Sequence, residues 1–320
     1  MKTIKNIILA FAALFAVQAL SACAALAASA YAGTSAAQFL KLGAGSKAGG
    51  VAEAYTAAAD DVYSAYYNPA GLTRMASPEF AAQHVSYFQD INYEFLAFAF
   101  PFDKTGDGMS KQALALSIYS LSVNDLETRT GDTLLASGLF DASDSAYALS
   151  YAYRLKKNFG LGATVKYIRE KIDTESAGAV AMDAGLYFKP LADKPLDIGL
   201  AVRNFGSKLN FGGGKDPLPL GGALGFAYTF LPGFKADVDF VQYRDTSLIL
   251  AGGAEYSRDF KHEMSGALRL GYTTHNKDVD GLRGIAAGAG LRYSRLMFDF
   301  AWVPFGDLGN TFRYTISARF

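Results

Sequence analysis

The clearest pattern in the chain lies in its last ten residues, 311–320, where apolar and polar side chains alternate. Phe, Tyr, Ile, Ala and Phe occupy the even positions, and Thr, Arg and Ser occupy the odd positions. Because successive side chains of a β-strand leave opposite faces of the sheet, a period of two predicts a strand. Such a strand separates an apolar environment from a polar one. The wall of a membrane barrel and the edge of a soluble sandwich both require this.

The same alternation recurs from Pro78 onward. In 234–240, for example, Phe, Ala, Val and Phe alternate with Lys, Asp and Asp. Each such segment has about the length that crosses a bilayer at a tilt. We expect fourteen strands, at residues 79–88, 91–102, 111–123, 144–155, 158–171, 178–189, 195–205, 219–230, 233–244, 247–257, 262–273, 283–292, 296–303 and 310–320.

The lengths of the connections distinguish a barrel from a sandwich. Long connections follow odd-numbered strands, at residues 124–143, 206–218, 274–282 and 304–309. Connections after even-numbered strands are mostly tight, as at Lys156-Lys157 and Leu231-Pro232; the segment 103–110 and the tight turn Gln89-Asp90 are exceptions. Long loops outside and short turns in the periplasm are typical of outer-membrane barrels. The sequence therefore predicts an all-β, transmembrane antiparallel barrel of about 14 strands.

Composition excludes several classes of function. Lys plus Arg and Asp plus Glu both number 30, so the net charge is zero and a nucleic-acid partner is not expected. The single cysteine, Cys23, rules out an intramolecular disulfide and a cysteine metal cluster. The three histidines lie on different predicted strands or loops, so we expect no metal site, and no cofactor motif is present.

The N-terminus has the pattern of a secretory signal, residues 1–32. Two lysines precede an apolar run, and small residues follow it. Ala-x-Ala sites at 28–30 and 30–32 favour ordinary cleavage, the second giving a mature start at Gly33. Alternatively, Leu-Ser-Ala-Cys at 20–23 resembles a lipobox, in which Cys23 would be lipidated. Beyond Gly33 no apolar run is long enough for a transmembrane helix.

Residues 33–77 differ from the strands that follow, and we expect them to form a domain separate from the barrel, 78–320. Ser35 is placed to cap a short helix over 36–42. Asn68-Pro69 disfavours helix at Asn68, and Pro69 with Gly71 predicts a tight turn. The adjacent Asp60 and Asp61 are candidates for binding a cation or for capping a helix.

Three motifs of this segment carry a resemblance: Gly33-Thr-Ser-Ala-Ala-Gln-Phe-Leu-Lys-Leu-Gly43, the glycines from Gly45 to Gly50, and Ala59-Asp-Asp through Tyr67-Asn-Pro-Ala-Gly-Leu72. Together they resemble the PorV/PorQ family, which is related to the FadL/TodX long-chain fatty acid transporters. The run Gly49-Gly-Val-Ala-Glu53 departs from that family's usual pattern. The resemblance implies that 33–77 folds inside the barrel as a plug. Its gate residues would then be Asp60, Asp61, Asn68, Pro69 and Gly71.

The C-terminal strand also resembles the closing strand of bacterial outer-membrane barrels, which end on Phe. This implies that Tyr314 and Phe320 signal to the barrel-assembly machinery. The polar faces of the strands are mostly Gly, Ala and Ser, which leaves room for a plug. Their charges, which we expect to face the lumen, are Lys166, Asp197, Arg203, Asp237, Asp239, Arg269, Arg292, Asp299 and Arg313.

Three functions in the bacterial outer membrane follow from these observations. In the first, a FadL-like barrel in contact with outer-membrane lipid passes a hydrophobic, fatty-acid-like small molecule, with the plug as gate and a kink or gap in the wall as a side exit. In the second, a PorV-like barrel receives secreted proteins in type IX secretion. The third, a lipid-modifying enzyme, rests only on His84-x-Ser86, which places an imidazole and a hydroxyl on one strand face. We expect no enzymatic activity.

Overall fold

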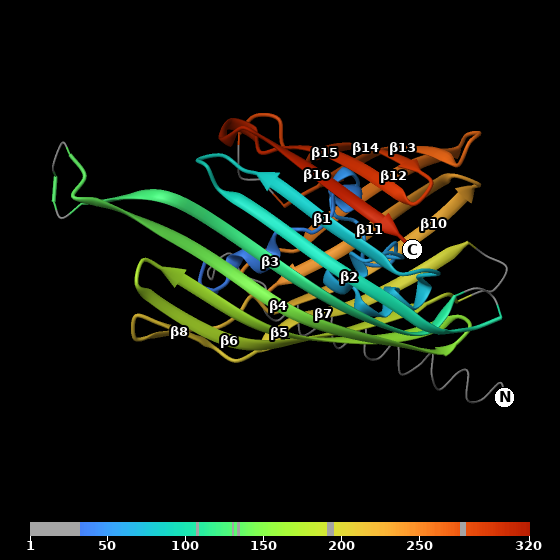
Figure 1. Ribbon diagram of the computed structural model, residues 1–320, viewed down its shortest axis with the longest axis horizontal. Coiled ribbons are helices and arrows are strands. Elements are labelled where there is room, and N and C mark those ends of the chain that lie inside the picture. The colour runs from blue at the N-terminus through green and yellow to red at the C-terminus, as the bar shows by residue number, and fades with distance from the viewer. Residues whose placement is uncertain (1–32, 107–108, 130, 133–134, 191–194, 276–279) are drawn as a thin grey trace.

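The computed structural model describes residues 33–106, 109–129, 131–132, 135–190, 195–275 and 280–320. The predicted signal peptide, residues 1–32 with Cys23, lies outside this part of the chain. Fourteen antiparallel strands form a closed barrel in which β1 pairs with both β2 and β16 (Figure 1). The predicted fold class is confirmed. No helix in the described ranges is long and apolar enough to cross a membrane.

The strands match the predicted positions within a few residues, apart from the outer ends of β3 and β4. The barrel strands are β1 (Glu79–Ser86), β2 (Asn92–Lys104), β3 (Ser110–Thr128), β4 (Gly138–Lys156), β5 (Phe159–Ile172), β6 (Glu175–Phe188), β7 (Leu196–Gly206), β10 (Gly221–Leu231), β11 (Phe234–Tyr243), β12 (Ile249–Asp259), β13 (Met264–Thr273), β14 (Ile285–Tyr293), β15 (Leu296–Pro304) and β16 (Asn310–Arg319). A short hairpin, β8 (Leu209–Phe211) with β9 (Gly214–Asp216), follows β7.

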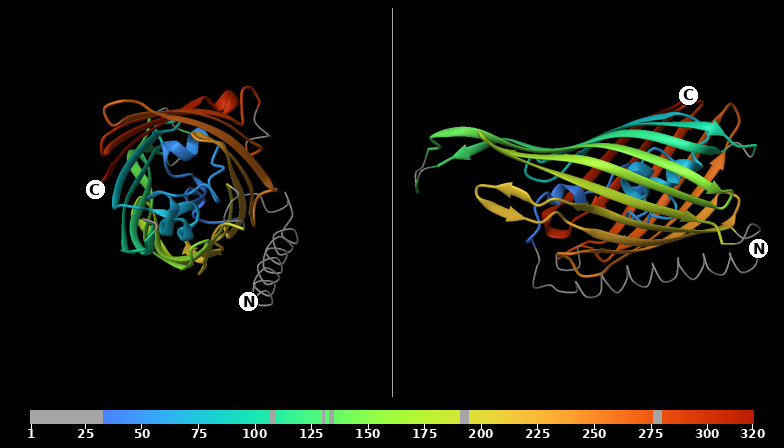
Figure 2. Two further views of the ribbon diagram at one scale, coloured as in Figure 1. Left: turned by 90° about the vertical axis from the view of Figure 1, so that its right-hand side faces the viewer. Right: turned by 90° about the horizontal axis from the view of Figure 1, so that it is seen from below.

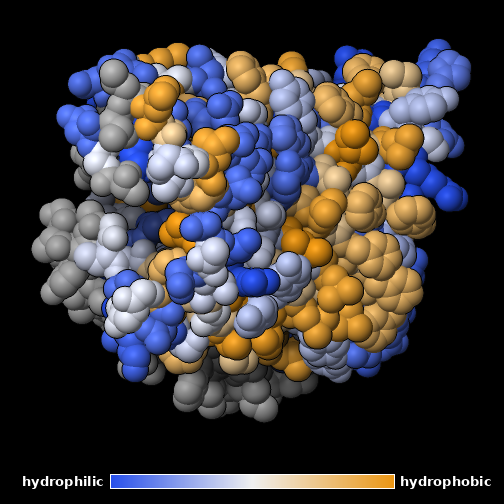
Figure 3. All heavy atoms as spheres, turned by 60° about the vertical axis from the view of Figure 1, so that its left-hand side comes forward, coloured by the Kyte–Doolittle hydropathy of each residue, from blue (hydrophilic) through white to orange (hydrophobic). Residues whose placement is uncertain are grey.

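The alternation in the sequence corresponds to the two faces of the wall. On β3, Leu114, Leu116 and Ile118 are 40–60% exposed, whereas Ala113 and Ala115 between them are buried. Figure 3 shows apolar residues gathered on the wall, while the end that faces the viewer is mostly polar. An apolar outer band around a polar interior is the surface that a bilayer requires.

The two ends of the barrel differ, and we call them the loop end and the turn end. The loop end carries the long connections, including the β3–β4 hairpin that projects beyond the wall (Figure 1). At the turn end, the amide of Phe320 donates to the carbonyl of Pro78 at 3.0 Å, so the last strand closes onto the first. The expected long loop 124–143 was wrong. Most of it extends β3 and β4, whose pairing continues to Thr128 and Gly138.

Of the kink or gap expected in the wall, no gap occurs among the strands described here. Each of the fourteen strands is hydrogen-bonded to both neighbours. The β6–β7 ladder is irregular between Met182 and Ala184, where Asn204 adopts a positive φ of 63°. This is a bulge in a continuous wall, because pairing resumes on both sides of it.

Residues 33–77 lie inside the barrel (Figure 2). They contain four short helices, namely η2 (Gln38–Lys41), α2 (Ser46–Gly50), α3 (Ser64–Tyr67) and η3 (Pro69–Arg74). The predicted helix 36–42 is only the 3₁₀ turn η2, and Ser35 does not cap it. Ala37 precedes η2 in a left-handed conformation and makes no side-chain capping bond.

Glycines in the wall allow this segment to approach the strands closely. A methyl group at Gly288 of β14 would lie 2.9 Å from the Cα of Gly50, a distance that real side chains do not adopt. At Gly253 of β12, it would lie 2.5 Å from the Cβ of Val51. Thus the small residues of the polar face make room for the N-terminal segment. Further close contacts of this kind occur at Gly162, Gly185, Gly199, Gly225 and Gly271.

Candidate functional site in the lumen

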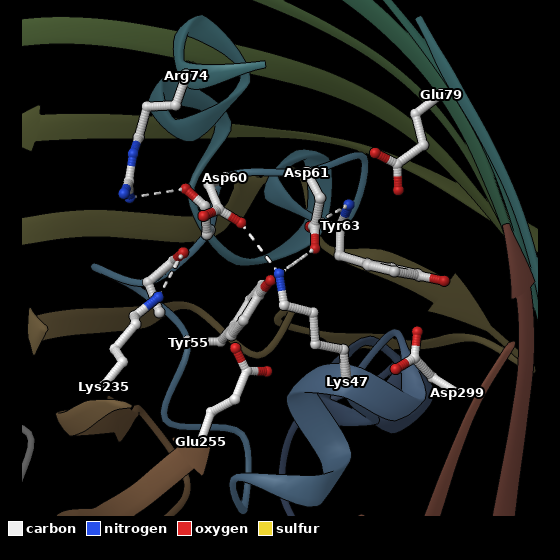
Figure 4. A network of polar contacts seen from close by, with 12 residues as sticks. Lys47, Tyr55, Asp60, Asp61, Tyr63, Arg74, Glu79, Lys235, Glu255 and Asp299 are labelled. Atoms are coloured by element: carbon white, nitrogen blue, oxygen red, sulfur yellow. Dashed lines mark hydrogen bonds and ion pairs between the residues drawn. The ribbon is translucent and has the colours of Figure 1, made fainter. Parts of the chain in front are cut away.

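A buried ion cluster links two parts of the N-terminal segment (Figure 4). The ammonium of Lys47, on α2, lies 3.1 Å from Asp60 and 3.0 Å from Asp61. The hydroxyl of Tyr55 donates to Asp61 at 2.6 Å, and the amide of Tyr63 donates to the same carboxylate at 3.1 Å. We call Lys47, Tyr55, Asp60 and Asp61 the Lys47 cluster. The cation that the two aspartates bind is therefore a side chain of the same protein.

The charges of the Lys47 cluster shift its pKa values in opposite directions. Burial alone would raise the pKa of Asp60, but Lys47, Lys235 and Arg74 outweigh it and lower that pKa. Burial alone would lower the pKa of Lys47, but Asp60 and Asp61 hold it well above its usual value. Both groups are therefore charged near neutral pH, and the attraction between them fixes α2 to the segment 60–61.

Asn68 joins the N-terminal segment to the wall. Its backbone is extended, with φ −160° and ψ 100°, as predicted for a residue before proline. The side-chain oxygen accepts from the Ala70 amide at 3.2 Å and so caps η3. The side-chain nitrogen donates at 3.0 Å to the carbonyls of Thr56 and of Leu186 on β6. Asn68 thus connects three stretches of chain.

Pro69 and Gly71 have steric roles in the same turn. Pro69 begins η3, where its fixed φ and missing N–H suit the first turn of a helix. A methyl group at Gly71 would lie 2.5 Å from the carbonyl oxygen of Ala59. The predicted tight turn at 69–71 is thus the beginning of η3, and glycine is needed for close packing against Ala59.

Several of the lumen charges listed from the sequence bind the N-terminal segment directly. Asp197 pairs with Arg74 at 3.1 Å, and Arg313 pairs with Glu53 at 2.8 Å. The carboxylate of Asp239 accepts from the amides of Tyr55 and Thr56 at 3.0 and 2.8 Å. These contacts come from β7, β16 and β11, which hold the segment from different sides of the lumen.

The other charges predicted to face the lumen, apart from Arg203, pair within the wall. Arg269 lies between Glu255, at 2.5 Å, and Asp299, at 2.6 Å. Lys166 pairs with Asp183 at 2.8 Å. Asp237 pairs with Lys235 at 3.9 Å, and Arg292 pairs with Asp259 at 3.0 Å.

α2 separates two cavities of the lumen. The turn-end cavity, of about 500 Å³, is lined by charged residues that include Lys47, Asp61, Glu79, Arg269 and Asp299. The loop-end cavity is smaller, about 100 Å³. Among the described residues, none lines both cavities. Lys47 of α2 lines the turn-end cavity and Gly49 of α2 lines the loop-end cavity, so α2 lies between the two spaces. It packs against strands β13 to β16.

The loop-end cavity is lined mainly by apolar residues, and its charged residues are Lys41, Glu53, Arg203 and Arg313. Its lining includes Tyr67, Tyr87, Val241, Tyr243, Ile249, Ile285 and Phe305. Arg203 is only 5% exposed and lies 5.6 Å from the Tyr66 ring and 5.5 Å from the Tyr243 ring. Its Nε is buried and has no hydrogen-bond acceptor in the described part of the protein. A buried guanidinium facing a cavity is a site for an acceptor group of a ligand.

The C-terminal and enzymatic candidates lie on the wall, away from the cavities. Tyr314 and Phe320 are 42% and 63% exposed on the apolar face. His84 and Ser86 are also exposed, and His84 bonds Glu94 at 2.6 Å. In the described ranges, no three His, Cys, Asp or Glu side chains form a group that could hold a metal.

Sequence analysis missed several residues that now belong to the site, above all Lys47, Tyr55 and Arg74. They lie in irregular backbone, where no period indicates a direction for a side chain. The presence of two adjacent aspartates was the available signal that a cation lay nearby. It did not indicate which cation.

Residues 14–212 match the model of UPF0164, an uncharacterised protein family. The chain belongs to UPF0164. A search of curated protein sequences gives no match. The resemblance of this UPF0164 protein to PorV/PorQ stays a prediction.

Solved structures with the same fold include those of hydrocarbon channels. The CymD monoaromatic hydrocarbon channel is 11% identical, with a TM-score of 0.59, and the match covers 87% of the UPF0164 chain and 98% of CymD. The toluene transporter TodX of Pseudomonas putida is 12% identical, with a TM-score of 0.56 and coverage of 87% and 96%. The toluene transporter TbuX of Ralstonia pickettii is 12% identical, with a TM-score of 0.54 and coverage of 87% and 98%. At these identities the likeness establishes the fold alone.

Proposed function

We propose that this UPF0164 protein lies in the bacterial outer membrane and passes hydrophobic small molecules through its lumen. The loop end faces outside and the turn end faces the periplasm. The observation that carries the proposal is the arrangement of an apolar loop-end cavity, α2 and a polar turn-end cavity in series. The fold shared with the toluene transporters TodX and TbuX and with the monoaromatic hydrocarbon channel CymD supports it.

The substrate class is an apolar molecule with an acceptor or anionic group at one end, such as a fatty acid. Aromatic and aliphatic side chains line most of the loop-end cavity, which suits a hydrocarbon. Arg203 then supplies a positive charge to the polar end. A pure hydrocarbon would leave the guanidinium of Arg203 without a counter-charge on the side of the cavity, which an anionic group would supply.

The gate is the N-terminal segment, and α2 is its central element. The two cavities are separate in this conformation, so passage requires α2 to move away from β13–β16. The Lys47 cluster holds α2 to the rest of the segment through charged groups. Since ion pairs exchange partners or water more readily than packed aromatic cores rearrange, this contact is the natural point of release.

A second candidate function is supported by the loop end. The β3–β4 hairpin extends past the wall (Figure 1), and Leu135 and Leu139 on it are 83% and 62% exposed. Exposed leucines on a hairpin above an occluded lumen are suited to contact with protein partners. In this alternative, the barrel is a PorV-like receiver of secreted proteins, and no small molecule passes.

One experiment separates the two candidates. The protein is purified gently from its own membranes, and the small molecules bound to it are identified by mass spectrometry. We expect a stoichiometric lipophile with an acidic or acceptor end, reduced at least tenfold in Arg203→Gln. The control is Arg292→Gln, which removes a cation from the turn end and leaves the lipophile bound. A lumen free of lipophile, with co-purifying secreted proteins, would contradict the transporter and support the receiver.

A further inference from the structure

A third pocket lies outside the lumen route, at the turn end of the wall. It has a volume of about 380 Å³ and lies between the β2–β3 connection and the β4–β5 turn. We call it the basic pocket. Its described lining residues are Thr105, Gly106, Lys111, Arg154, Leu155, Lys156 and Lys157.

The described lining of the basic pocket is positively charged. Four of its seven described lining residues are Lys or Arg, and none of the seven is acidic. The carboxylate of Asp103 is 3.7 Å from Lys111 in a largely exposed pair, and Asp107 of the same connection lies outside the described residues. Lys156 and Lys157 are exposed and make no hydrogen bond through their ammonium groups in the described ranges. Their charges are available to an external anion.

Arg154 gives the pocket a fixed shape. Its side chain is 8% exposed, unlike those of the lysines around it. One guanidinium nitrogen donates to the Lys157 carbonyl at 2.6 Å, and another donates to the Thr105 hydroxyl at 3.2 Å. Arg154 thereby ties the β4–β5 turn to the β2–β3 connection. The two sides of the pocket are held at a set distance before any ligand binds.

The pocket opens beside the apolar face of the wall. Leu155 lines it and is 53% exposed, on the face opposite the buried Ala152 and Arg154. The neighbouring outward residues of β2, β3 and β5 are Phe100, Leu114 and Leu161, each more than 40% exposed. A ligand whose anionic end binds in the pocket can therefore place hydrocarbon chains along this wall.

We propose that the basic pocket binds the phosphate of an anionic phospholipid headgroup in the membrane leaflet at the turn end. Lys111, Lys156 and Lys157 pair with the phosphate, Arg154 positions the turn, and the acyl chains lie against Leu155 and the wall. Basic side chains at the edge of an apolar band attract anionic lipids in this way. A free inorganic anion would use the charges but not the apolar wall. The site is independent of transport through the lumen.

Native mass spectrometry of the full-length protein tests this site. The delipidated protein is titrated with phosphatidylglycerol, with phosphatidylcholine and with inorganic phosphate. The test variant is Lys156→Gln/Lys157→Gln. The matched control, Lys261→Gln/Arg295→Gln, removes two exposed cations from other turns at the same end and outside the pocket.

We expect phosphatidylglycerol to bind in preference to phosphatidylcholine. In the test variant, the affinity for phosphatidylglycerol should fall about thirtyfold, because each lysine near the headgroups contributes roughly 1 kcal/mol. The control is expected to keep wild-type affinity, and both variants to keep the lumen lipophile. Equal weakening in test and control would overturn the proposal in favour of general attraction. Phosphate bound as tightly as phosphatidylglycerol would overturn it in favour of a free-anion site, and unchanged lipid affinity in the test variant would also overturn it.

Discussion

Lys47 and Gly49 lie two residues apart on α2, yet Lys47 lines the turn-end cavity and Gly49 lines the loop-end cavity. A single turn of helix therefore forms the partition between the two spaces. It is held by charge on one side, through Asp60 and Asp61, and by glycine contacts with the wall on the other. The partition is thin enough for small changes in α2 to connect the cavities.

Replacing Gly253 by valine is expected to displace α2 and the following turn. A Cβ at this position would lie 2.5 Å from the Cβ of Val51, and overpacking of this kind costs about 1–3 kcal/mol. Hydrogen exchange of residues 46–56 is expected to accelerate. The control is Gly252→Val on the adjacent position, where the nearest atom to the new Cβ is 3.8 Å away. Equal protection in both variants would show that the wall does not hold α2.

Replacing Lys47 by methionine removes the cation from between two carboxylates. Loss of one partner from a buried ion pair costs about 3–5 kcal/mol, and we expect the low end because Asp60 is 38% exposed. The N-terminal segment should therefore release at lower denaturant, while the barrel still shows heat-modifiable migration on a gel. Lys47→Met/Asp60→Asn/Asp61→Asn removes all three charges and is expected to recover part of the loss. No recovery in this triple variant would mean that Lys47 acts through packing and not through charge.

Replacing Asn68 by alanine is expected to loosen η3. The change removes the cap of Ala70, about 1 kcal/mol, and leaves the carbonyls of Thr56 and Leu186 without a donor. Asn68→Ser keeps a neutral capping oxygen and loses the amide donor, so its effect separates the two roles. The measurement is hydrogen exchange of residues 68–75. If serine and alanine give the same exchange, the cap contributes nothing measurable.

The attachment of α2 is expected to weaken in acid. The pKa of Asp60 is lowered in the folded protein, so its stabilising charge is fully present above the usual carboxyl pKa, near 4, and is lost as the pH falls below that value. Hydrogen exchange of residues 46–61, corrected for its intrinsic pH dependence, should be constant from pH 7 to 5 and faster at pH 3. In Asp60→Asn this change should be smaller. An identical pH dependence in the variant would assign the titration to another group.

Much of the barrel could be predicted from the sequence because the signal is local. The alternation of Leu114 and Leu116 with Ala113 and Ala115 specifies a strand and its two faces, and the lengths of the connections specify the two ends. The β3–β4 hairpin escaped this reasoning because both of its faces meet water beyond the wall. No apolar face remains there to mark the strand.

The contacts between side chains in the lumen depend on the tertiary structure. The sequence identified Asp60, Asp61 and Asn68 as unusual, but their partners are Lys47, Tyr55 and the wall of the barrel. The segment 33–77 has no period, since its short helices pack on every side. Its contacts come from strands up to 269 residues away, as between Ser46 and Thr315. Period-two patterning is set by neighbouring residues, whereas ion pairs inside a closed barrel depend on where distant strands place their charges. That is why the sequence determined the wall and only the tertiary structure decided the site.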